Sequence, residues 1–432
     1  MRFKTLDREQ EAAKRLLKRS ILSDEIYELW GSGSDYDSLH ADIRGRTQAR
    51  WPQYRTSSFR FKVDSYRGSR PLAEQRELIE TFDYMSFEGP IRMNKPDEHF
   101  TIFEDYELDG VRPRTLHFGR LIAESGRRAI NKYNLKKRSY IATTSMDAEL
   151  SLVTANLAQA APGKLAYDPF MGTGSFPVAC AHFGSAVFGS DLDGRSIRGK
   201  GNRNVKGNFK QYDTASLYFG GFISDITNTP LRPDRILDVI VCDPPYGVRE
   251  GLKVLGSTRA ALQEVVYLAD GTPAHLQANY IPPKKPYSFL RMLGDILDFS
   301  AERLADRGRL CMWMPVAGAP EGEETTAEAE DAPRSEYDIP KHPALELVSV
   351  CRQDFNKWSR RLLTYRRMSN EQVDQVALLA YQAQRLELGE ADRNTTSRAT
   401  ADDLNDFRKK YFQGFKEPGL SGFLRKGERG GT

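Results

Sequence analysis

Residues 7–30 carry apolar side chains at helical spacing. Leu17, Ile21 and Leu29 fall near one face and basic side chains fall on the other, which predicts a helix that ends at Gly31. The segment is amphipathic and basic like a mitochondrial transit peptide, but its several acidic residues argue against that interpretation.

The stretch from Ser57 to about Asp109 has the pattern of a small α+β unit. Apolar and basic residues alternate over residues 59–63, which predicts a strand. A helix is expected over residues 72–82, and a second strand over residues 100–106.

After residue 140, apolar strands alternate with helical segments at the spacing of βαβ units. This pattern predicts an α/β fold with an open, mostly parallel sheet. The strands are expected at Lys164–Tyr167, Ala186–Ser190, Phe222–Ser224, Ile236–Cys242 and Leu310–Met314, followed by a terminal hairpin of Leu345–Cys351 and Arg361–Arg366.

The charge of the chain is nearly balanced overall but concentrated locally. The 432 residues leave room for two or three domains, and 63 Lys and Arg against 59 Asp and Glu give a net charge of only +4. A polyanionic partner would therefore have to bind a local patch, and residues 111–140 supply one, although a solvated basic face is the alternative. The candidate RNA contacts are Arg112, Arg114, Arg120, Arg127, Arg128, Lys132, Lys136, Lys137 and Arg138.

Two further segments differ from the rest in composition. Residues 318–338 form an acidic insertion that we expect to be a disordered surface loop. Beyond Met368 we expect a polar tail with one helix at Gln372–Leu388 and a basic end.

Cysteine spacing and hydropathy limit the remaining classes. The four cysteines form no Cys-x-x-Cys pair and no histidine stands at ligand spacing, so neither a metal site nor a disulfide framework is predicted. The sequence contains no run of 18 apolar residues and no secretory signal pattern. We therefore expect a soluble, cytoplasmic protein with no membrane partner.

A glycine-containing turn follows the first predicted strand of the α/β region. It reads Asp168-Pro169-Phe170-Met171-Gly172-Thr173-Gly174. Such a turn is where this kind of sheet binds ligands, because glycines let the backbone approach a cofactor. Position 177 is Pro instead of the third glycine of the dinucleotide fingerprint, and no phosphate loop is present, so nicotinamide and nucleoside triphosphates are disfavoured.

Two acidic residues end the strands that follow this turn. Asp191 lies 19 residues after Gly172, where a carboxylate can accept hydrogen bonds from ribose hydroxyls. An adenosyl ligand without a pyrophosphate fits, although a plain turn and a helix cap are the alternatives. Asp225 could hold an adenine amino group or cap a turn.

The tetrapeptide Asp243-Pro244-Pro245-Tyr246 follows a very apolar strand. Its chemistry suits methylation of an exocyclic amine, whose lone pair is delocalised into a ring. The Asp243 carboxylate and the Pro244 carbonyl can each accept one N–H and free that lone pair. Pro245 restricts Pro244 to an extended conformation, and Tyr246 offers a face for stacking the base. The alternative is a turn that merely ends a buried strand.

Several longer phrases carry a family resemblance. They are Phe118-Gly119-Arg120-Leu121-Ile122-Ala123-Glu124, Lys136-Lys137-Arg138 with Thr143-Thr144-Ser145-Met146-Asp147-Ala148-Glu149-Leu150, Phe188-Gly189-Ser190-Asp191-Leu192-Asp193 and Tyr246-Gly247-Val248-Arg249-Glu250-Gly251. With the two motifs, they resemble the eukaryotic branch of the methyltransferases that place a THUMP RNA-binding domain before an S-adenosylmethionine domain and modify guanine 10 of tRNA. The resemblance runs from about residue 12 to 370.

The resemblance implies a domain organisation. The catalytic domain would be a Rossmann-like class I methyltransferase with a mostly parallel, seven-stranded sheet, preceded by an α+β THUMP-type region. The implied domains are residues 1–50 as a remnant of an N-terminal ferredoxin-like subdomain, 51–138 as the THUMP-like domain, 139–370 as the methyltransferase domain with the insertion at 318–338, and 371–432 as a polar and basic tail.

The resemblance also assigns roles to residues and implies partners. Asp243 to Tyr246 would form the target-amine pocket, and Asp168 to Gly174 with Asp191 would form the S-adenosylmethionine site. The Thr143–Leu150 segment would lie beside the methionine moiety, with Thr143 and Thr144 as cofactor contacts. Thr144 with Asp147 also fits a capping box that opens the next helix. The implied partners are tRNA and a small zinc-binding activator subunit that covers an apolar edge of the catalytic domain in a heterodimer.

The expected reaction is methyl transfer from S-adenosylmethionine to the exocyclic amine of guanine 10 in tRNA. Guanine 10 is paired within a stem, so its amine must be exposed by flipping the base out. The alternatives are a methyltransferase for adenine N6 or glutamine N5, which would use the same tetrapeptide, and a catalytically silent RNA-binding scaffold.

Overall fold

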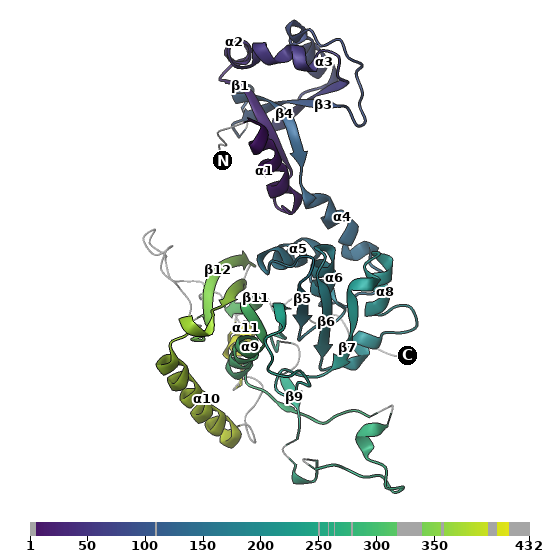
Figure 1. The fold of residues 1–432 in the computed structure, drawn as a ribbon, viewed down its shortest axis with the longest axis vertical. Helices are drawn as coiled ribbons and strands as arrows, with labels where there is room; N and C mark the ends of the chain where they lie inside the picture. The colour runs from purple at the N-terminus through teal and green to yellow at the C-terminus, as the bar shows by residue number, and fades with distance from the viewer. Residues whose placement is uncertain are drawn as a thin grey trace, which may run out of the picture. The chain divides into compact units, whose positions relative to one another are not determined.

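The computed structural model describes residues 6–413 apart from 109, 249–250, 258, 263, 278–279, 318–338, 356–357 and 396–403. The chain divides into two compact units, Met1–Lys132 and Tyr133–Thr432 (Figure 1). The acidic insertion and the basic end of the tail beyond residue 413 lie outside the described residues. Within them, every helix is too short or too polar to cross a membrane.

The first unit is a four-stranded sheet with helices against it. Its elements are α1 (Leu6–Lys18), β1 (Glu25–Gly33), α2 (Tyr36–Thr47), β2 (Phe59–Tyr66), α3 (Leu72–Glu80), β3 (Glu98–Tyr106) and β4 (Pro113–Glu124). The strand order is β1-β4-β3-β2, in which only β2 and β3 are parallel. Trp30, Phe100 and Phe118 from three strands form a fully buried aromatic core, against which α2 packs Leu39 and Ile43.

The predicted helix over residues 7–30 is wrong in its second half. Helix α1 ends at Lys18, and residues 25–33 form β1 instead. The spacing of apolar residues cannot distinguish a helix from a strand here. As a strand, this segment buries Trp30 in the sheet core, and its Glu28 pairs with two arginines. Tertiary pairing with β4 decides the outcome.

The position of β1 in the sheet shows that the expected boundary at residue 50 is wrong. The prediction separated residues 1–50 from residues 51–138, but β1 lies in one sheet with β2 to β4. The division falls between Lys132 and Tyr133. The predicted strands at 59–63 and 100–106 and the helix at 72–82 are confirmed.

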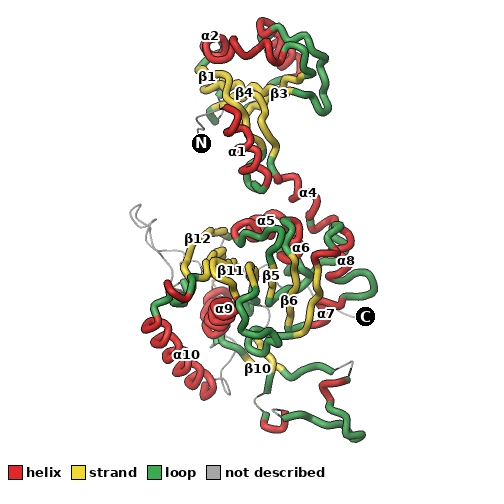
Figure 2. The backbone as a smooth tube through the Cα atoms, in the orientation of Figure 1, coloured by secondary structure: helices red, strands yellow, loops and turns green. Residues whose placement is uncertain are grey.

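The second unit is built on a seven-stranded sheet, drawn in yellow in Figure 2. Its elements are α4 (Ala129–Tyr133, across the division), α5 (Ala148–Leu157), β5 (Leu165–Asp168), α6 (Ser175–His182), β6 (Ala186–Asp191), α7 (Gly194–Arg198), α8 (Val205–Gln211), β7 (Tyr218–Ile223), β8 (Leu237–Cys242), β9 (Lys253–Leu255), β10 (Lys284–Pro286), α9 (Phe289–Arg303), β11 (Leu304–Ala317), β12 (Leu345–Asp354), β13 (Trp358–Arg367), α10 (Gln375–Thr395) and α11 (Asp406–Gln413). The order is β12-β13-β11-β8-β5-β6-β7, parallel from β11 to β7, with the terminal hairpin antiparallel. The predicted α/β fold with a mostly parallel sheet is confirmed.

The alternation of side chains along the central strands assigns helices to opposite faces of the sheet. Ile240 and Met312 pack in one core cluster with α9 residues such as Ile296. Trp313, the next residue along β11, points to the other face, where its indole N–H donates to Thr154 of α5 at 3.1 Å. Both faces are therefore covered, as a parallel sheet requires.

Two local predictions are corrected. The third strand, expected at Phe222–Ser224, lies at Tyr218–Ile223, because the glycines at its centre hide a strand from a search for apolar runs. The helix expected to begin after Thr144 begins after Asp147, whose carboxylate caps the Glu149 N–H at 2.8 Å. Asp147 is therefore the cap itself.

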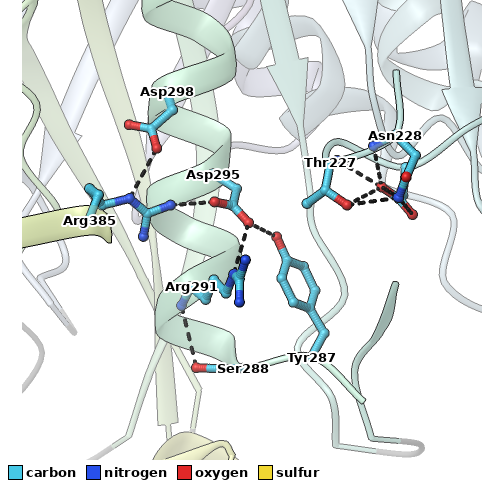
Figure 3. Close-up of polar contacts among 9 residues, drawn as sticks. Thr227, Asn228, Tyr287, Ser288, Arg291, Asp295, Asp298 and Arg385 are labelled. Atoms are coloured by element: carbon cyan, nitrogen blue, oxygen red, sulfur yellow. Dashed lines mark hydrogen bonds and ion pairs between the residues drawn. The ribbon is translucent and has the colours of Figure 1, made fainter. Parts of the chain in front are cut away.

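The predicted helix at Gln372–Leu388 is confirmed as α10, but it is not part of a free tail. Arg385 binds Asp295 and Asp298 of α9, in the second case at 3.0 Å (Figure 3). Tyr381 donates to Asp298 at 2.8 Å, and these residues line a cavity of about 910 Å³ that contains no residue of the two motifs. Helix α10 thus belongs to the second unit.

Candidate active site

Four carboxylates follow adjacent strands at one edge of the sheet. Strands β8, β5, β6 and β7 are neighbours and run parallel, so their carboxyl ends meet at the same edge. Asp243, Asp168, Asp191 and Asp225 stand at or just after those ends. The fold therefore brings both sequence motifs to the edge where open α/β sheets bind ligands.

The glycine turn is held in a shape that requires its glycines. Gly172 and Gly174 have φ values of +51° and +85°, a region that other residues adopt only with strain. A Cβ on Gly174 would lie 3.0 Å from Val205, whereas a Cβ on Gly172 would have no atom closer than 4.0 Å. The backbone at Gly172 therefore borders open space that a ligand can occupy.

Asp191 anchors this turn from the next strand. One carboxylate oxygen accepts the Gly172 N–H and the other accepts the Asp193 N–H, both at 2.8 Å. Each oxygen keeps lone-pair capacity for hydroxyl donors of a ligand. Burial raises the pKa of Asp191, and the two backbone N–H bonds oppose that rise more than the charge of Lys284 does.

Asp168 is buried with one acceptor unused. The carboxyl is 1% exposed, its Oδ1 accepts the Phe170 N–H at 2.9 Å, and its Oδ2 has no hydrogen-bond partner among the described residues. Burial raises its pKa well above the usual value, and the charges of Asp191 and Asp243 raise it further. A ligand that brings positive charge or N–H donors would relieve both conditions.

The segment around Thr143 and Thr144 lies next to the glycine turn. Both threonines are exposed, and the hydroxyl of the nearby Ser145 is 2.7 Å from the hydroxyl of Thr173. Asn208 of α8, fully buried, donates to the Thr173 carbonyl at 3.2 Å. Sequence reasoning missed Ser145 and Asn208 as supports of the turn, since no motif marks either residue.

Asp225 follows the turn-capping alternative in this structure. Its Oδ1 accepts the backbone N–H groups of Thr227 and Asn228 at 2.7 and 2.8 Å (Figure 3 labels both partners). Its Oδ2 accepts the Leu255 N–H at 2.6 Å and so ties β9 to the end of β7. A contact with an adenine amino group would have to share these oxygens.

Tyr246 fixes the carboxylate of Asp243. Its hydroxyl donates to Asp243 Oδ1 at 2.6 Å. Its ring makes edge contacts with Trp358 of β13 and Phe407 of α11, with centroid distances of 5.9 and 6.3 Å. Pro244 is buried and Pro245 is exposed. The tetrapeptide is therefore held through its tyrosine, whose stacking role stays a prediction.

The ionisation of Asp243 is set by opposing effects. Burial raises its pKa, while the Tyr246 hydrogen bond and the positive charge of Arg360 lower it. Arg360 of β13 lies over the Trp313 ring at 4.5 Å. Sequence reasoning missed Arg360, because only the antiparallel pairing of β13 with β11 brings this part of the chain beside the motif.

Two members of the predicted basic surface are not available to bind RNA. Arg120 is 9% exposed and donates to Glu28 and Glu98 at 3.0 and 2.9 Å. Arg138 is 5% exposed and donates to Ser175 at the start of α6. Both are structural arginines, because burial forces a cation to find partners. The exposed members include Arg112, Arg114, Arg128, Lys132, Lys136 and Lys137.

Family models match both units. Residues 4–127 match the Tmrp11 THUMP N-terminal domain, and residues 136–260 match the RMKL-like methyltransferase domain. With the Rossmann-like sheet and its motifs, these matches define a THUMP-containing, S-adenosylmethionine-dependent methyltransferase. Similar proteins of known activity narrow this class to one family.

The tRNA (guanine(10)-N(2))-methyltransferase of Saccharomyces cerevisiae (strain ATCC 204508 / S288c) is 46% identical over 371 residues, which cover 83% of this chain and 82% of that protein. The enzyme of the same name from Schizosaccharomyces pombe (strain 972 / ATCC 24843) is 38% identical over 405 residues, covering 93% and 78%. The crystal structure of TrmN from Thermus thermophilus has 16% identity and a TM-score of 0.39, covering 85% of this chain and 88% of that one. The chain belongs to the tRNA (guanine(10)-N(2))-methyltransferase family, which confirms the resemblance.

The residues at the glycine turn fit the cofactor of this class. S-adenosylmethionine carries positive charge and ribose hydroxyls, and when bound it supplies an electrophilic methyl group on a positively charged sulfur. Asp168 would accept donors of the cationic methionine part, the open backbone of Gly172 would admit it, and Asp191 would accept the hydroxyls. Pro169, Phe170, Thr173 and Gly174 complete this turn.

Proposed function

We propose that this protein methylates the exocyclic N2 amine of guanine 10 in tRNA and that Asp243 with Pro244 activates the amine. The observation that carries the proposal is the placement of Asp243, whose carboxylate is fixed by Tyr246 at the same sheet edge as the cofactor turn. A half-buried carboxylate that a tyrosine hydroxyl holds in place beside a ligand-binding turn is typical of a group that contacts the reacting atoms.

Activation requires only hydrogen-bond acceptors in the right places. One N–H of the amine would donate to Asp243 and the other to the Pro244 carbonyl, so that the nitrogen turns toward tetrahedral geometry and its lone pair becomes nucleophilic. The Tyr246 hydroxyl donates to Oδ1 of the carboxylate, and we assign the amine to Oδ2. Asp243 need not act as a strong base, because the amine becomes acidic once it carries the methyl group.

The direct test maps the methylated base. The full chain, with and without the candidate activator, is incubated with unmodified tRNA and labelled methyl donor, and the product is digested and sequenced by mass spectrometry. We expect N2-methylguanine at position 10. Label on adenine N6 or on a glutamine side chain would favour the alternative amine substrates. A chain that binds no donor would be a scaffold.

We also propose that exposed basic residues near the division between the two units bind the tRNA backbone. Lys136 and Lys137 are exposed and sit on one short turn. Changing both to Gln should weaken tRNA binding and reduce the slope of log affinity against log salt by about one to two, since each phosphate contact on a duplex contributes about 0.9. Binding titrations over a range of salt concentrations measure this slope.

The matched control for that pair is Lys341→Gln, which removes an exposed charge beside β12. Its slope should equal that of the unaltered chain. Equal slopes for the unaltered chain, the double variant and Lys341→Gln would contradict the proposal that Lys136 and Lys137 bind the tRNA backbone.

The edge strand β7 is the place where we propose that the zinc-binding activator docks. Within the described part of the chain, β7 pairs on one side only, so its other edge offers backbone donors and acceptors to a partner. Phe219 is 70% exposed on this strand, and a cavity of about 350 Å³ is lined by Leu165, Phe188 and residues 219–222. An apolar side chain of the partner could fill that space.

Phe219→Asp should abolish co-purification with the activator, because the change puts a charge at the centre of the apolar edge. Pull-down of the tagged full chain measures retention. The control is Val348→Asp on β12 at the opposite edge of the sheet, where Val348 is 42% exposed. If both variants retain the activator equally well, β7 is not its docking edge.

The cytoplasmic location of the complex also stays a prediction.

A further inference from the structure

The segment Leu404–Tyr411, which lies in the predicted polar and basic tail, packs against the tetrapeptide loop. Phe407 is 1% exposed and Asn405 is 3% exposed. The carbonyl of Leu404 accepts the Phe289 N–H at 3.0 Å, which fixes the segment to the start of α9. We infer that this segment, through Asn405, Phe407 and Arg408, positions the loop that activates the substrate amine.

Three consecutive carbonyls of the loop are bound by this segment. Asn405 Nδ2 donates to the Tyr246 carbonyl at 2.9 Å. Arg408 Nη1 donates to the carbonyls of Gly247 and Val248 at 2.7 and 2.5 Å. The arginine bonds are charge-assisted, which makes them stronger than bonds between neutral groups. The backbone just after the two prolines is therefore held from outside the loop.

The close approach of the two segments depends on glycine. Gly247 has a φ of +73°, and a Cβ at this position would lie 2.6 Å from Asn405 Nδ2. Any other residue would be strained and would also push Asn405 away. The loop is thus shaped to receive Asn405.

The same segment holds the tyrosine ring. The ring of Phe407 contacts that of Tyr246 edge-on, and it lies 6.0 Å from that of Trp358. Tyr246 in turn donates to Asp243. Movement of α11 would therefore disturb both acceptors of the amine: the Asp243 carboxylate through the tyrosine, and the Pro244 carbonyl through the backbone that follows it.

This inference rests on the proposed function, because the segment acts through the residues that contact the amine. The three residues are positioning residues and touch neither substrate. Loss of their contacts should lower the rate of methyl transfer and leave the binding of both substrates nearly unchanged.

Asn405→Asp is the sharpest variant. Asn405 Oδ1 caps the Arg408 N–H at 3.0 Å, and a carboxylate retains that cap. The Nδ2 group that donates to the Tyr246 carbonyl is replaced by a carboxylate oxygen, which repels that carbonyl oxygen. We expect kcat to fall about tenfold or more, with the Kd of the methyl donor and of tRNA within about twofold. Arg408→Gln should behave alike, and Arg408→Lys should recover part of the rate.

The matched control is Lys409→Ala, whose side chain is exposed on the same helix. It should leave kcat unchanged. kcat is measured with the full chain and the activator at saturating substrates, and the single-turnover rate isolates the methyl-transfer step. Amide hydrogen exchange of residues 246–248 provides a readout that needs no activity, and we expect faster exchange in Asn405→Asp than in the unaltered chain.

Unaltered exchange and unaltered kcat in Asn405→Asp and Arg408→Gln would overturn the inference. A parallel fall in donor and tRNA affinity would also overturn it, because that result indicates general loss of structure. If the unaltered chain methylates a base other than guanine 10, the proposed function fails on the product map, and the positioning role is still decided by exchange and by the rate at that base.

Discussion

Asp243→Ala is expected to reduce methyl transfer to tRNA on the order of 10²–10³-fold, the size of effect seen when one preorganised hydrogen-bonding group is removed from an active site. The substitution removes the acceptor that Tyr246 holds in place and leaves the amine lone pair delocalised. Donor affinity should change far less than the rate, because among the described residues the hydrogen bond given for the Asp243 carboxylate goes to Tyr246 and not to the glycine turn. Single-turnover rates at saturating tRNA and donor measure the loss.

Asp243→Asn is the matched variant for this prediction. The amide keeps the shape of the side chain and one oxygen acceptor, but it introduces N–H donors and removes the negative charge. Its rate should fall between those of the unaltered enzyme and the alanine variant. Turnover that is undiminished in Asp243→Ala would show that the tetrapeptide does not activate the amine.

The parts of the site that the sequence could reveal are local in the chain. The glycine turn and the tetrapeptide each follow an apolar strand directly, so strand prediction alone places them at the carboxyl edge of the sheet. The order of β8, β5 and β6 then brings Asp243, Asp168 and Asp191 together. Only this last step requires long-range pairing, since β5 and β8 are distant in the chain.

The parts that escaped prediction depend on contacts between distant segments. Asn405 and Arg408 follow Tyr246 by about 160 residues, and nothing in a short, polar C-terminal helix indicates what it packs against. Composition also failed to separate the buried Arg120 from the exposed Arg112, since burial depends on the register of β4 with β1 and β3. A basic window in a sequence is therefore a weak guide to a basic surface.

Differences in burial explain why β1 escaped prediction while β5, β6 and β8 did not. Buried parallel strands are continuous apolar runs, which are distinct from helices at this length. Strand β1 pairs with β4, and its burial is uneven, with Trp30 inside and Leu29 exposed. Such a strand has no periodicity that distinguishes it from the end of an amphipathic helix.

Asp191→Ala should raise the Kd of the methyl donor about 100-fold, because it removes the acceptor of two backbone N–H groups and of the ligand hydroxyls. The left-handed conformation at Gly172 would then lose its support. At saturating donor the rate of methyl transfer should largely recover, since Asp243 and Pro244 are untouched. Equilibrium binding of labelled donor measures the affinity, and Asp234→Asn, an exposed acid outside the site, is the control.

Loss of Asp191 should therefore weaken donor binding, whereas loss of Asp243 should slow methyl transfer. Asp191→Asn keeps one oxygen for the turn and should lose less affinity than the alanine variant. If Asp191→Ala bound donor as tightly as the control, the open space at Gly172 would not be the cofactor site, and the orphaned oxygen of Asp168 would need another ligand. If instead the rate at saturating donor stayed low, Asp191 would act on the amine loop as well, through the shared edge of β5, β6 and β8.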